Sequence, residues 1–249
     1  MDTSTRQASV SAGVEVSLVR GGLFYRLQQG LGLLRPNHWN LGRRIVIFVA
    51  VAWLPLVLIT AVVNRAGLFS LLTDYRVYSR LLIAIPVLLI GELLMESRFR
   101  MVMGHIWKTG LLDAPELEEL HGTVTRLVRV RDSFVPEMLI VLLMVVHTVT
   151  SFRGQVDTTP WLAQSLGGEL QLTAAGWYAV IVSASIFQLL LGVALWRWLL
   201  WTYFMFRLSR RNLKLVATHP DEHGGLGFLG LTAAAFAPIA FAATAVIAA

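Results

Sequence analysis

The sequence contains no cysteine and few charged residues. The absence of cysteine excludes disulfide bonds, thiolate nucleophiles and cysteine-ligated metals. Only 14% of the 249 residues are charged, whereas a soluble domain is usually about a quarter charged. With 56% hydrophobic residues and a mean hydropathy of +0.66, the composition is typical of a membrane protein.

Residues 1–42 also lack the charged start, short apolar core and small-residue cleavage site of a signal peptide. We therefore expect the first apolar segment to act as its own insertion signal. Between residues 14 and 34, apolar residues recur at helical spacing, which predicts an amphipathic helix on the inner leaflet. This helix belongs to a cytoplasmic N-terminal arm, residues 1–44. An arm packed against the rest of the protein is the alternative, because several glycines weaken the helix.

Five apolar segments are long enough to cross a bilayer, for which a helix needs about 20 residues. The predicted fold class is all-α: a polytopic transmembrane helix bundle of five spans, with the N-terminal amphipathic helix before it and a helical cytoplasmic loop inside it. The fourth segment is longer than a bilayer requires, so its helix should tilt or project into water. The bundle occupies residues 45–249, and the spans are residues 45–63, 81–97, 135–152, 174–206 and 226–249.

Residues 98–134, between the second and third spans, have the composition of a water-soluble segment. The run Asp113-Ala114-Pro115-Glu116 has capping-box spacing with proline in the first turn, and apolar residues follow at helical spacing. Acidic residues gather at the start and basic residues at the end, as suits the helix dipole. We predict that this helix lies outside the membrane.

Basic residues predict the orientation of the spans. With five spans, residues 1–44, 97–134 and 207–224 share one side and hold 16 Lys and Arg residues, against 4 in residues 65–80 and 153–175. Because basic residues favour the cytoplasmic side, we place the N-terminus in the cytoplasm. The net charge of +6 therefore reflects sidedness and does not indicate nucleic-acid binding.

Four charged side chains lie in or at the edge of the predicted spans: Glu92, Glu96, Glu137 and Arg197. A charge at the centre of a bilayer costs about 3 kcal/mol or more, so such side chains usually face protein or water. Counting residues at 1.5 Å each places all four toward the cytoplasmic half. One interpretation is a polar pocket or ion path that opens inward. The other is an ion pair, most simply Glu96 with Arg197, that holds two helices in register.

Histidines offer two further candidate sites. His147 lies well inside the third span, where we expect a hydrogen-bonded core side chain, with proton relay as the alternative. The loop after the fourth span carries His219, Asp221 and His223, whose alternate spacing can point them the same way. A divalent metal such as zinc accepts this ligand set, but a turn capped by Asp221 or Glu222 is the simpler interpretation, and headgroup binding is a third. We therefore predict no cofactor, with a metal at this loop as the alternative.

The fourth span ends in an aromatic run followed by basic residues. The aromatic residues cover every side of the helix, which favours a belt at the cytoplasmic interface; they are Trp196, Trp198, Trp201, Tyr203, Phe204 and Phe206. The basic residues that follow are predicted to bind anionic lipid headgroups; they are Arg207, Arg210, Arg211 and Lys214.

Two segments resemble a group of uncharacterised bacterial multi-pass membrane proteins. The first is His219-Pro220-Asp221 followed by Gly224-Gly225-Leu226-Gly227-Phe228-Leu229, and the second runs from Leu82 to Glu92. The resemblance implies a protein of the bacterial inner membrane and brings no activity with it.

The function we expect first is transport or channel-like conduction of a small ion or solute. It rests on the inner carboxylates and on prolines in or beside four spans, Pro55, Pro86, Pro136 and Pro238. The alternatives are a membrane-embedded metal-binding enzyme at the His219 loop, which is the less expected class, and a non-catalytic scaffold or signalling partner. The expected partners are the bilayer, its anionic headgroups and further copies of the chain, because five short helices hardly enclose a pore.

Overall fold

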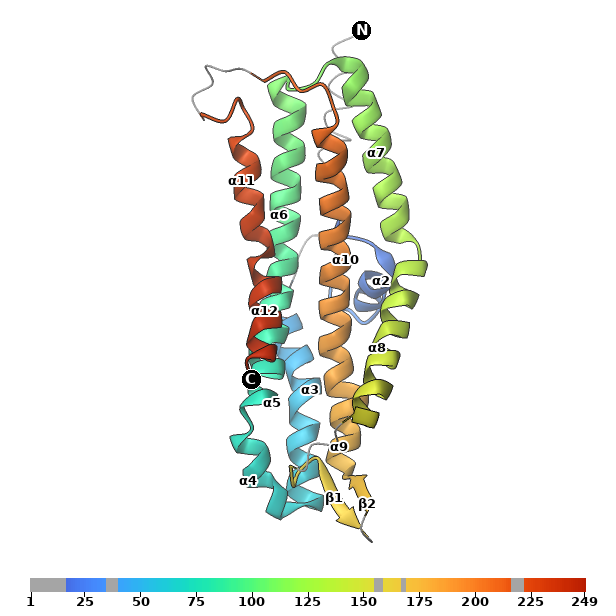
Figure 1. Cartoon of the computed structure of the whole chain (residues 1–249), viewed down its shortest axis with the longest axis vertical. Coiled ribbons are helices and arrows are strands. Elements are labelled where there is room, and N and C mark those ends of the chain that lie inside the picture. Colours follow the sequence, from blue (N-terminus) through green and yellow to red (C-terminus); the bar gives the residue numbers. More distant parts are fainter. Residues whose placement is uncertain (1–16, 35–39, 155–158, 167–168, 216–221) are drawn as a thin grey trace. The chain divides into compact units, whose positions relative to one another are not determined.

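The computed structural model describes residues 17–34, 40–154, 159–166, 169–215 and 222–249. These residues are mostly helical, with one two-stranded sheet (Figure 1). Their contacts form two compact units, which we describe separately. Unit 1 contains the described residues of 1–31, 91–137 and 194–237, and unit 2 contains those of 32–90, 138–193 and 238–249.

The α-helices in chain order are α2 (Gly22–Gly30), α3 (Leu41–Val63), α4 (Arg65–Thr73), α5 (Tyr75–Tyr78), α6 (Ile85–Thr109), α7 (Ala114–Asp132), α8 (Val135–Gly154), α9 (Ala174–Tyr178), α10 (Ala184–Ser209), α11 (Gly227–Ala233) and α12 (Ala237–Ile247). Two π-helical turns, η1 (Ser79–Ala84) and η2 (Ala179–Ser183), and one 3₁₀ turn, η3 (Ala234–Phe236), join helices end to end. The strands are β1 (Ala163–Leu166) and β2 (Glu169–Leu172).

Four helical stretches are long and apolar enough to cross a membrane: Leu41–Val63, Tyr75–Thr109, Ala174–Ser209 and Gly227–Ile247. A fifth span results if α7 and α8, which meet at a bend of 46°, are counted together. The predicted all-α membrane bundle is therefore confirmed, with four spans where five were predicted, or five if the bent pair is one span. The protein is embedded in a membrane, because surfaces this apolar need lipid as their solvent.

The second span is longer than predicted. It runs for 35 residues, Tyr75–Thr109, and not only over residues 81–97. Pro86 does not end the helix: it is the second residue of α6, just after the π-helical turn η1, where the regular α-helical hydrogen-bond pattern is already interrupted. At 1.5 Å per residue the stretch measures about 50 Å, well beyond a hydrocarbon slab of about 30 Å. Part of the segment assigned to the cytoplasmic loop is therefore a continuation of this helix.

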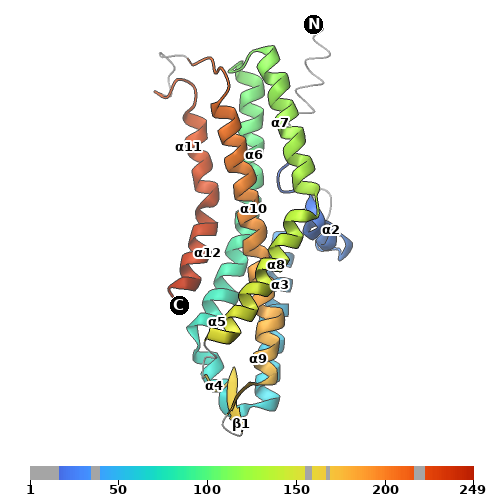
Figure 2. The same ribbon diagram turned by 45° about the vertical axis from the view of Figure 1, so that its right-hand side comes forward.

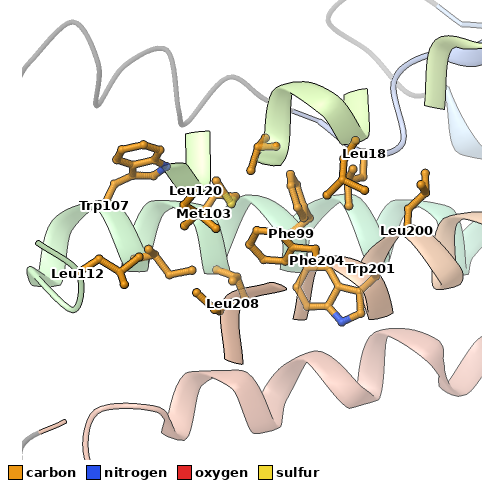
Figure 3. Close-up of a cluster of buried hydrophobic side chains, with 14 residues drawn as sticks. Leu18, Phe99, Met103, Trp107, Leu112, Leu120, Leu200, Trp201, Phe204 and Leu208 are labelled. Carbon is orange, nitrogen blue, oxygen red and sulfur yellow. The ribbon is translucent and has the colours of Figure 1, made fainter. Parts of the chain in front are cut away.

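The core of unit 1 forms where α7 packs against α6 and α10 (Figure 2). Figure 3 shows its centre, where Phe99 meets Trp201 and Phe204 edge to face at ring distances of 5.8 and 5.7 Å. Such aromatic pairs add about 0.5–1.5 kcal/mol each to the gain from burial. The helical face that α7 buries was predicted from its spacing: Leu120, Val124 and Leu127 are buried, together with Thr123.

The start of α7 differs from its prediction. Among the described side chains, no cap hydrogen bond forms at this N-terminus, although the sequence has capping-box spacing. Asp113 instead pairs with Lys214, whose Nζ lies 2.5 Å from Oδ1. The backbone N–H of Lys214 also donates to the Leu111 carbonyl at 2.9 Å. The chain after α10 is therefore held against the loop that precedes α7.

In unit 2, two side chains compensate for the proline in α3. Pro55 has no N–H, so the carbonyl four residues earlier, that of Val51, loses its helical partner. The Tyr178 hydroxyl donates to this carbonyl at 2.6 Å, and the Ser183 hydroxyl donates to the neighbouring Ala52 carbonyl at 2.6 Å. Both donors flank the π-helical turn η2 or lie in it. Lipid offers no hydrogen bonds, so this repair keeps the proline acceptable inside a span.

The described part of the segment before α9 contains a β-hairpin. Strands β1 and β2 pair antiparallel, with Ala163 opposite Leu172, and Thr173 caps α9 by accepting from the Gly176 N–H at 2.9 Å. Trp161 is buried and donates its indole N–H to Asp74 at 3.0 Å. This hairpin is thereby fixed to the turn between α4 and α5 (Figure 1).

Candidate functional site

Glu92 and Arg197 form a buried ion pair in unit 1. Glu92 on α6 and Arg197 on α10 are only 4% and 6% exposed, and Nη1 of the arginine lies 2.7 Å from Oε1 of the glutamate. The predicted pairing of Arg197 with Glu96 is wrong, because the partner lies one helical turn earlier in α6. Arg197 also donates through Nη2 to the backbone oxygen of Val19 at 3.0 Å. One guanidinium therefore joins two membrane helices and the N-terminal segment.

Glu96 lies one turn further along α6 and is 2% exposed. Its carboxylate accepts from the Ser17 hydroxyl at 2.5 Å and from Nε of Arg100 at 2.8 Å. Nε of Arg20 lies 3.6 Å away. Glu96 is therefore neutralised by arginines of its own helix and of the N-terminal segment, and not by α10.

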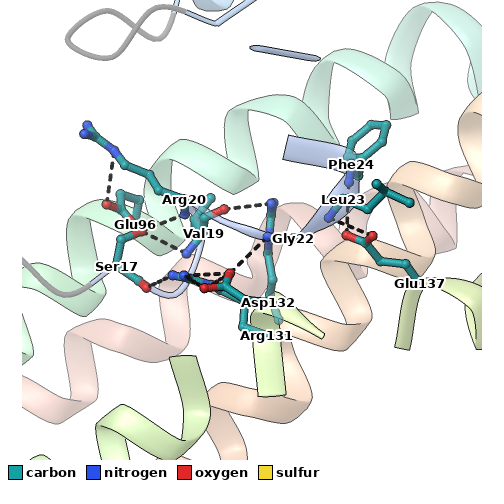
Figure 4. A network of polar contacts seen from close by, with 11 residues as sticks. Ser17, Val19, Arg20, Gly22, Leu23, Phe24, Glu96, Arg131, Asp132 and Glu137 are labelled. Carbon is teal, nitrogen blue, oxygen red and sulfur yellow. Dashed lines mark hydrogen bonds and ion pairs between the residues drawn. The ribbon is translucent and has the colours of Figure 1, made fainter. Parts of the chain in front are cut away.

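Residues 17–24, which we call the strap, have no regular structure up to Gly21 and then enter α2. Figure 4 shows that polar groups of α6 and α7 hold the strap in place. The Ser17 hydroxyl, besides donating to Glu96, accepts the N–H groups of Val19 and Arg20 at 3.0 and 2.7 Å. Arg131 donates to the Ser17 carbonyl. Polar groups of the strap are thus satisfied by side chains that are far away in the sequence, and not by the regular hydrogen bonds of a helix.

Asp132 and Glu137 fix the end of the strap. Arg131 binds Asp132 with both Nε and Nη2 at 2.8 Å, and Asp132 accepts the Gly22 N–H at 3.1 Å. Glu137 accepts the N–H groups of Leu23 and Phe24 at 2.8 and 3.1 Å, so it caps the first turn of α2. A carboxylate at this position also suits the positive end of the helix dipole.

Gly22 makes this arrangement sterically feasible. Its φ of +83° lies in the left-handed region that side chains avoid, and an added Cβ would approach Oε1 of Glu137 to 2.5 Å. The pair Gly21-Gly22 was expected only to weaken a helix. The structure shows instead that Gly22 allows the tight turn that brings α2 onto Glu137.

The network balances its charges within unit 1. Its carboxylates are Glu92, Glu96, Asp132 and Glu137, and its arginines are Arg20, Arg100, Arg131 and Arg197. Removing an ion from water costs several kcal/mol, so burial of Glu92, Glu96 and Arg197 depends on the pairing. An apolar hollow of about 10 Å³ next to Arg197 and Val19 gives room for roughly one water molecule. In this arrangement the network can hold the strap and exclude water from the paired charges.

Three of the four charged side chains that were predicted inside the membrane form hydrogen bonds to the strap: Arg197, Glu96 and Glu137. Glu92 joins them through Arg197. Sequence reasoning missed Ser17, Arg20 and Asp132, which carry no sign of their role beyond being polar. It also missed Arg44 in unit 2, which is fully buried although it stands among basic residues at the start of a span.

His147 does not lie in a helical core. Its side chain is exposed on α8 in unit 2, so the expected core histidine is wrong. The physical reason is that α8 is apolar on nearly every side, so its sequence does not mark which face packs. Its neighbours Val145, Val146 and Val149 are exposed as well, at 46–50%.

The basic residues at the end of α10 and just after it divide into two groups. Arg211 pairs with Glu119 and, at 3.4 Å, with Glu116, and Lys214 pairs with Asp113. We call these contacts between the chain just after α10 and the N-terminal part of α7 with the residue before it the clasp. The hydrogen bond and the charge of Arg211 hold the pKa of the exposed Glu119 carboxyl below its ordinary value. Two of the predicted headgroup ligands, Arg211 and Lys214, are thus engaged within the chain.

Arg210 and Arg207 leave the headgroup prediction open for the other two positions. Arg210 lies over the Phe206 ring at 5.2 Å, a cation–π contact at the surface. The aromatic belt is also divided: Trp201 and Phe204 are buried in the core, whereas the side chains of Trp198, Tyr203 and Phe206 are 41–53% exposed. Only the exposed part can serve an interface.

The predicted metal ligands His219 and Asp221 lie outside the described residues, so that ligand set stays a prediction. His223 is described, and nowhere in the described ranges do three or more His, Asp or Glu side chains gather as a metal site would require. Comparison with known proteins adds no relative: no protein-family model, no curated protein and no solved structure matches this chain.

Proposed function

We propose that this chain is a multi-pass protein of the bacterial inner membrane, with a cytoplasmic N-terminus, that conducts or transports a small ion or solute. The polar network is its site, and the strap lies across that site in a closed arrangement. The observation that carries the proposal is the buried pair of Glu92 and Arg197 on two membrane-spanning helices, with Glu96 one turn away.

The position of these charges supports movement of an ion. Ionisable side chains inside membrane spans are expensive to bury and commonly mark ion pathways or proton relays. Glu92 and Glu96 are four residues apart, so both carboxylates lie on one face of α6. Two carboxylates in succession along one helix can provide a cation or a proton with two successive binding sites.

The contacts of the strap support a closed arrangement. Arg197 donates a hydrogen bond to the Val19 carbonyl of the strap, and Glu96 accepts one from the Ser17 hydroxyl. The hollow beside them has room for about one water molecule, which is too small for a solute. Release of the strap would free bonding groups on both side chains at once.

The test is flux through liposomes that contain the purified protein. Proton, K⁺ and Na⁺ gradients are imposed in turn, and uptake is followed by a pH-sensitive dye or by ion-selective electrodes. We expect flux of one of these ions from the wild type that Glu92→Gln abolishes. The matched control is Glu118→Gln, an exposed carboxylate of α7, which should leave the flux unchanged. Absence of flux from both the wild type and a Gly22→Ala variant with a loosened strap would overturn the proposal.

A scaffold is the second candidate, and one observation favours it. Glu92, Glu96, Asp132 and Glu137 all bond to groups of the chain itself, as expected of a network that only stabilises a fold. A scaffold keeps its fold without conducting when the pair becomes apolar. A stable Glu92→Met/Arg197→Met protein, together with absence of flux from both the wild type and Gly22→Ala, would favour the scaffold.

A further inference from the structure

One exposed flank of α2 is apolar, whereas a helix that packs on a soluble protein usually exposes polar residues. Leu23, Leu27 and Leu31 are 58%, 56% and 64% exposed. At 3.6 residues per turn these three positions fall within an arc of about 80°. The neighbouring positions Phe24 and Gln28 are buried. The helix therefore has one flank for the protein and an adjacent apolar flank, the leucine face, that no described residue covers.

We infer that the leucine face of α2 inserts into the interfacial layer of the bilayer, with anionic phospholipid as its partner. This goes beyond the proposed function, because it holds whether or not the protein moves an ion. The occupant is lipid, and not a second protein, for the following two reasons.

The first reason is the place where α2 is held. Glu137, which caps α2, lies in the first turn of the apolar helix α8. Beside it, Phe134 and Val135 are 68% and 59% exposed. The leucine face thus lies next to the point where an apolar, membrane-spanning surface begins. That is the depth at which an interfacial helix is found.

The second reason is charge. Arg26 is exposed and lies beside Leu23 on the flank of α2 away from Phe24. A long basic side chain at the edge of an apolar face can bury its methylenes and reach a phosphate with its guanidinium. Anionic headgroups attract such a residue. An apolar face bordered by arginine has the chemistry of an interfacial helix.

The absence of cysteine from the chain makes a direct test simple. Leu27→Cys on the leucine face and Gln29→Cys on the opposite, exposed side each receive an NBD fluorophore in the full-length protein. The labelled proteins are placed in vesicles of phosphatidylcholine and phosphatidylglycerol. Quenching is measured with aqueous iodide and with lipids that carry a nitroxide high on the acyl chain.

We expect the label at position 27 to be quenched several-fold more by the lipid nitroxide than the label at 29, and iodide to show the opposite order. Arg26→Gln should reduce lipid quenching at 27 more in vesicles with phosphatidylglycerol than in pure phosphatidylcholine. Equal access of iodide to both labels would overturn the inference. A label at 27 that is shielded from both quenchers would also overturn it, because a protein would then cover the face.

Discussion

The guanidinium of Arg197 lies 2.7 Å from the Glu92 carboxylate and 3.0 Å from the Val19 carbonyl. These two bonds connect α10 with α6 and with the strap. Because Arg197 and Glu92 are almost fully buried, removal of either side chain takes away the charge that faces the other. The strap is thus coupled to the same side chain that holds the two helices together.

Loss of one partner should cost far more than loss of both. Glu92→Met or Arg197→Met alone leaves a buried charge uncompensated and should lower the free energy of unfolding by about 3–5 kcal/mol. The double variant should recover most of that loss. It should keep a residual cost of about 1 kcal/mol for the lost Arg197–Val19 hydrogen bond, because the Val19 carbonyl still accepts the Gly21 N–H at 3.1 Å. Unfolding by SDS in mixed micelles measures all three proteins.

The control for this cycle is Glu118→Met at an exposed position, which should change the stability by no more than about 0.5 kcal/mol. Additive losses in the double variant would show that the two side chains do not act as a pair.

A second prediction concerns the turn at Gly22. Gly22→Ala places a Cβ 2.5 Å from Glu137 in a left-handed backbone conformation, so we expect a loss of about 1–3 kcal/mol. Gly30→Ala in the same helix meets no atom within 4 Å and should be neutral or stabilising by up to about 1 kcal/mol. Thermal unfolding in detergent compares the two. Similar Tm values for both variants would contradict the tight turn.

A third prediction concerns the proline in α3. Tyr178→Phe removes the donor to the Val51 carbonyl and should cost about 1 kcal/mol of stability. In a Pro55→Ala background the new N–H of residue 55 can bond that carbonyl, so the same change at Tyr178 should cost much less. A double-mutant cycle on unfolding free energies measures the difference. An equal loss of stability in both backgrounds would show that the Tyr178 hydrogen bond does not compensate for the proline.

A fourth prediction is the pH dependence of the clasp. Arg211 lowers the pKa of Glu119 in the folded protein, so the unfolded chain binds its proton first as pH falls. The contribution of Glu119 is present above its ordinary pKa of 4.5 and is lost as pH falls through the lower folded pKa. The Tm difference between wild type and Glu119→Gln should therefore be largest near neutral pH and disappear in strong acid.

Glu118→Gln serves as the control for the clasp, because Glu118 is exposed and forms no ion pair in the part of the chain described. Its Tm difference from the wild type should not change over the same pH range. A Glu119→Gln difference that grew as pH fell would contradict the assigned sign.

The sequence predicted those parts of the fold that depend on lengths and periods. Lipid demands about 20 apolar residues for each span, so the existence of the spans could be read directly. The period of α7 likewise revealed its buried face, Leu120, Val124 and Leu127. These features are local, and each depends on neighbours within one helix.

The sequence indicated which charged residues form the site, but not which of them pair with one another. Glu92 and Glu96 differ by one turn, or about 6 Å of rise, which is finer than residue counting can resolve when helix ends and tilts are unknown. The strap had no period to reveal it, because its hydrogen bonds go to Glu96, Asp132 and Glu137, far away in sequence. Local patterns carry no record of such contacts.

The central claim is that the strap closes a polar site formed by Glu92, Glu96 and Arg197. The most direct test is ion flux into liposomes by wild type, Gly22→Ala and Gly22→Ala/Glu92→Gln, each normalised to the amount of monodisperse protein reconstituted. We predict faster flux for Gly22→Ala than for the wild type, and loss of that increase in the double variant. Flux in folded Gly22→Ala no faster than in the wild type, or an increase that survives Glu92→Gln, would contradict the account.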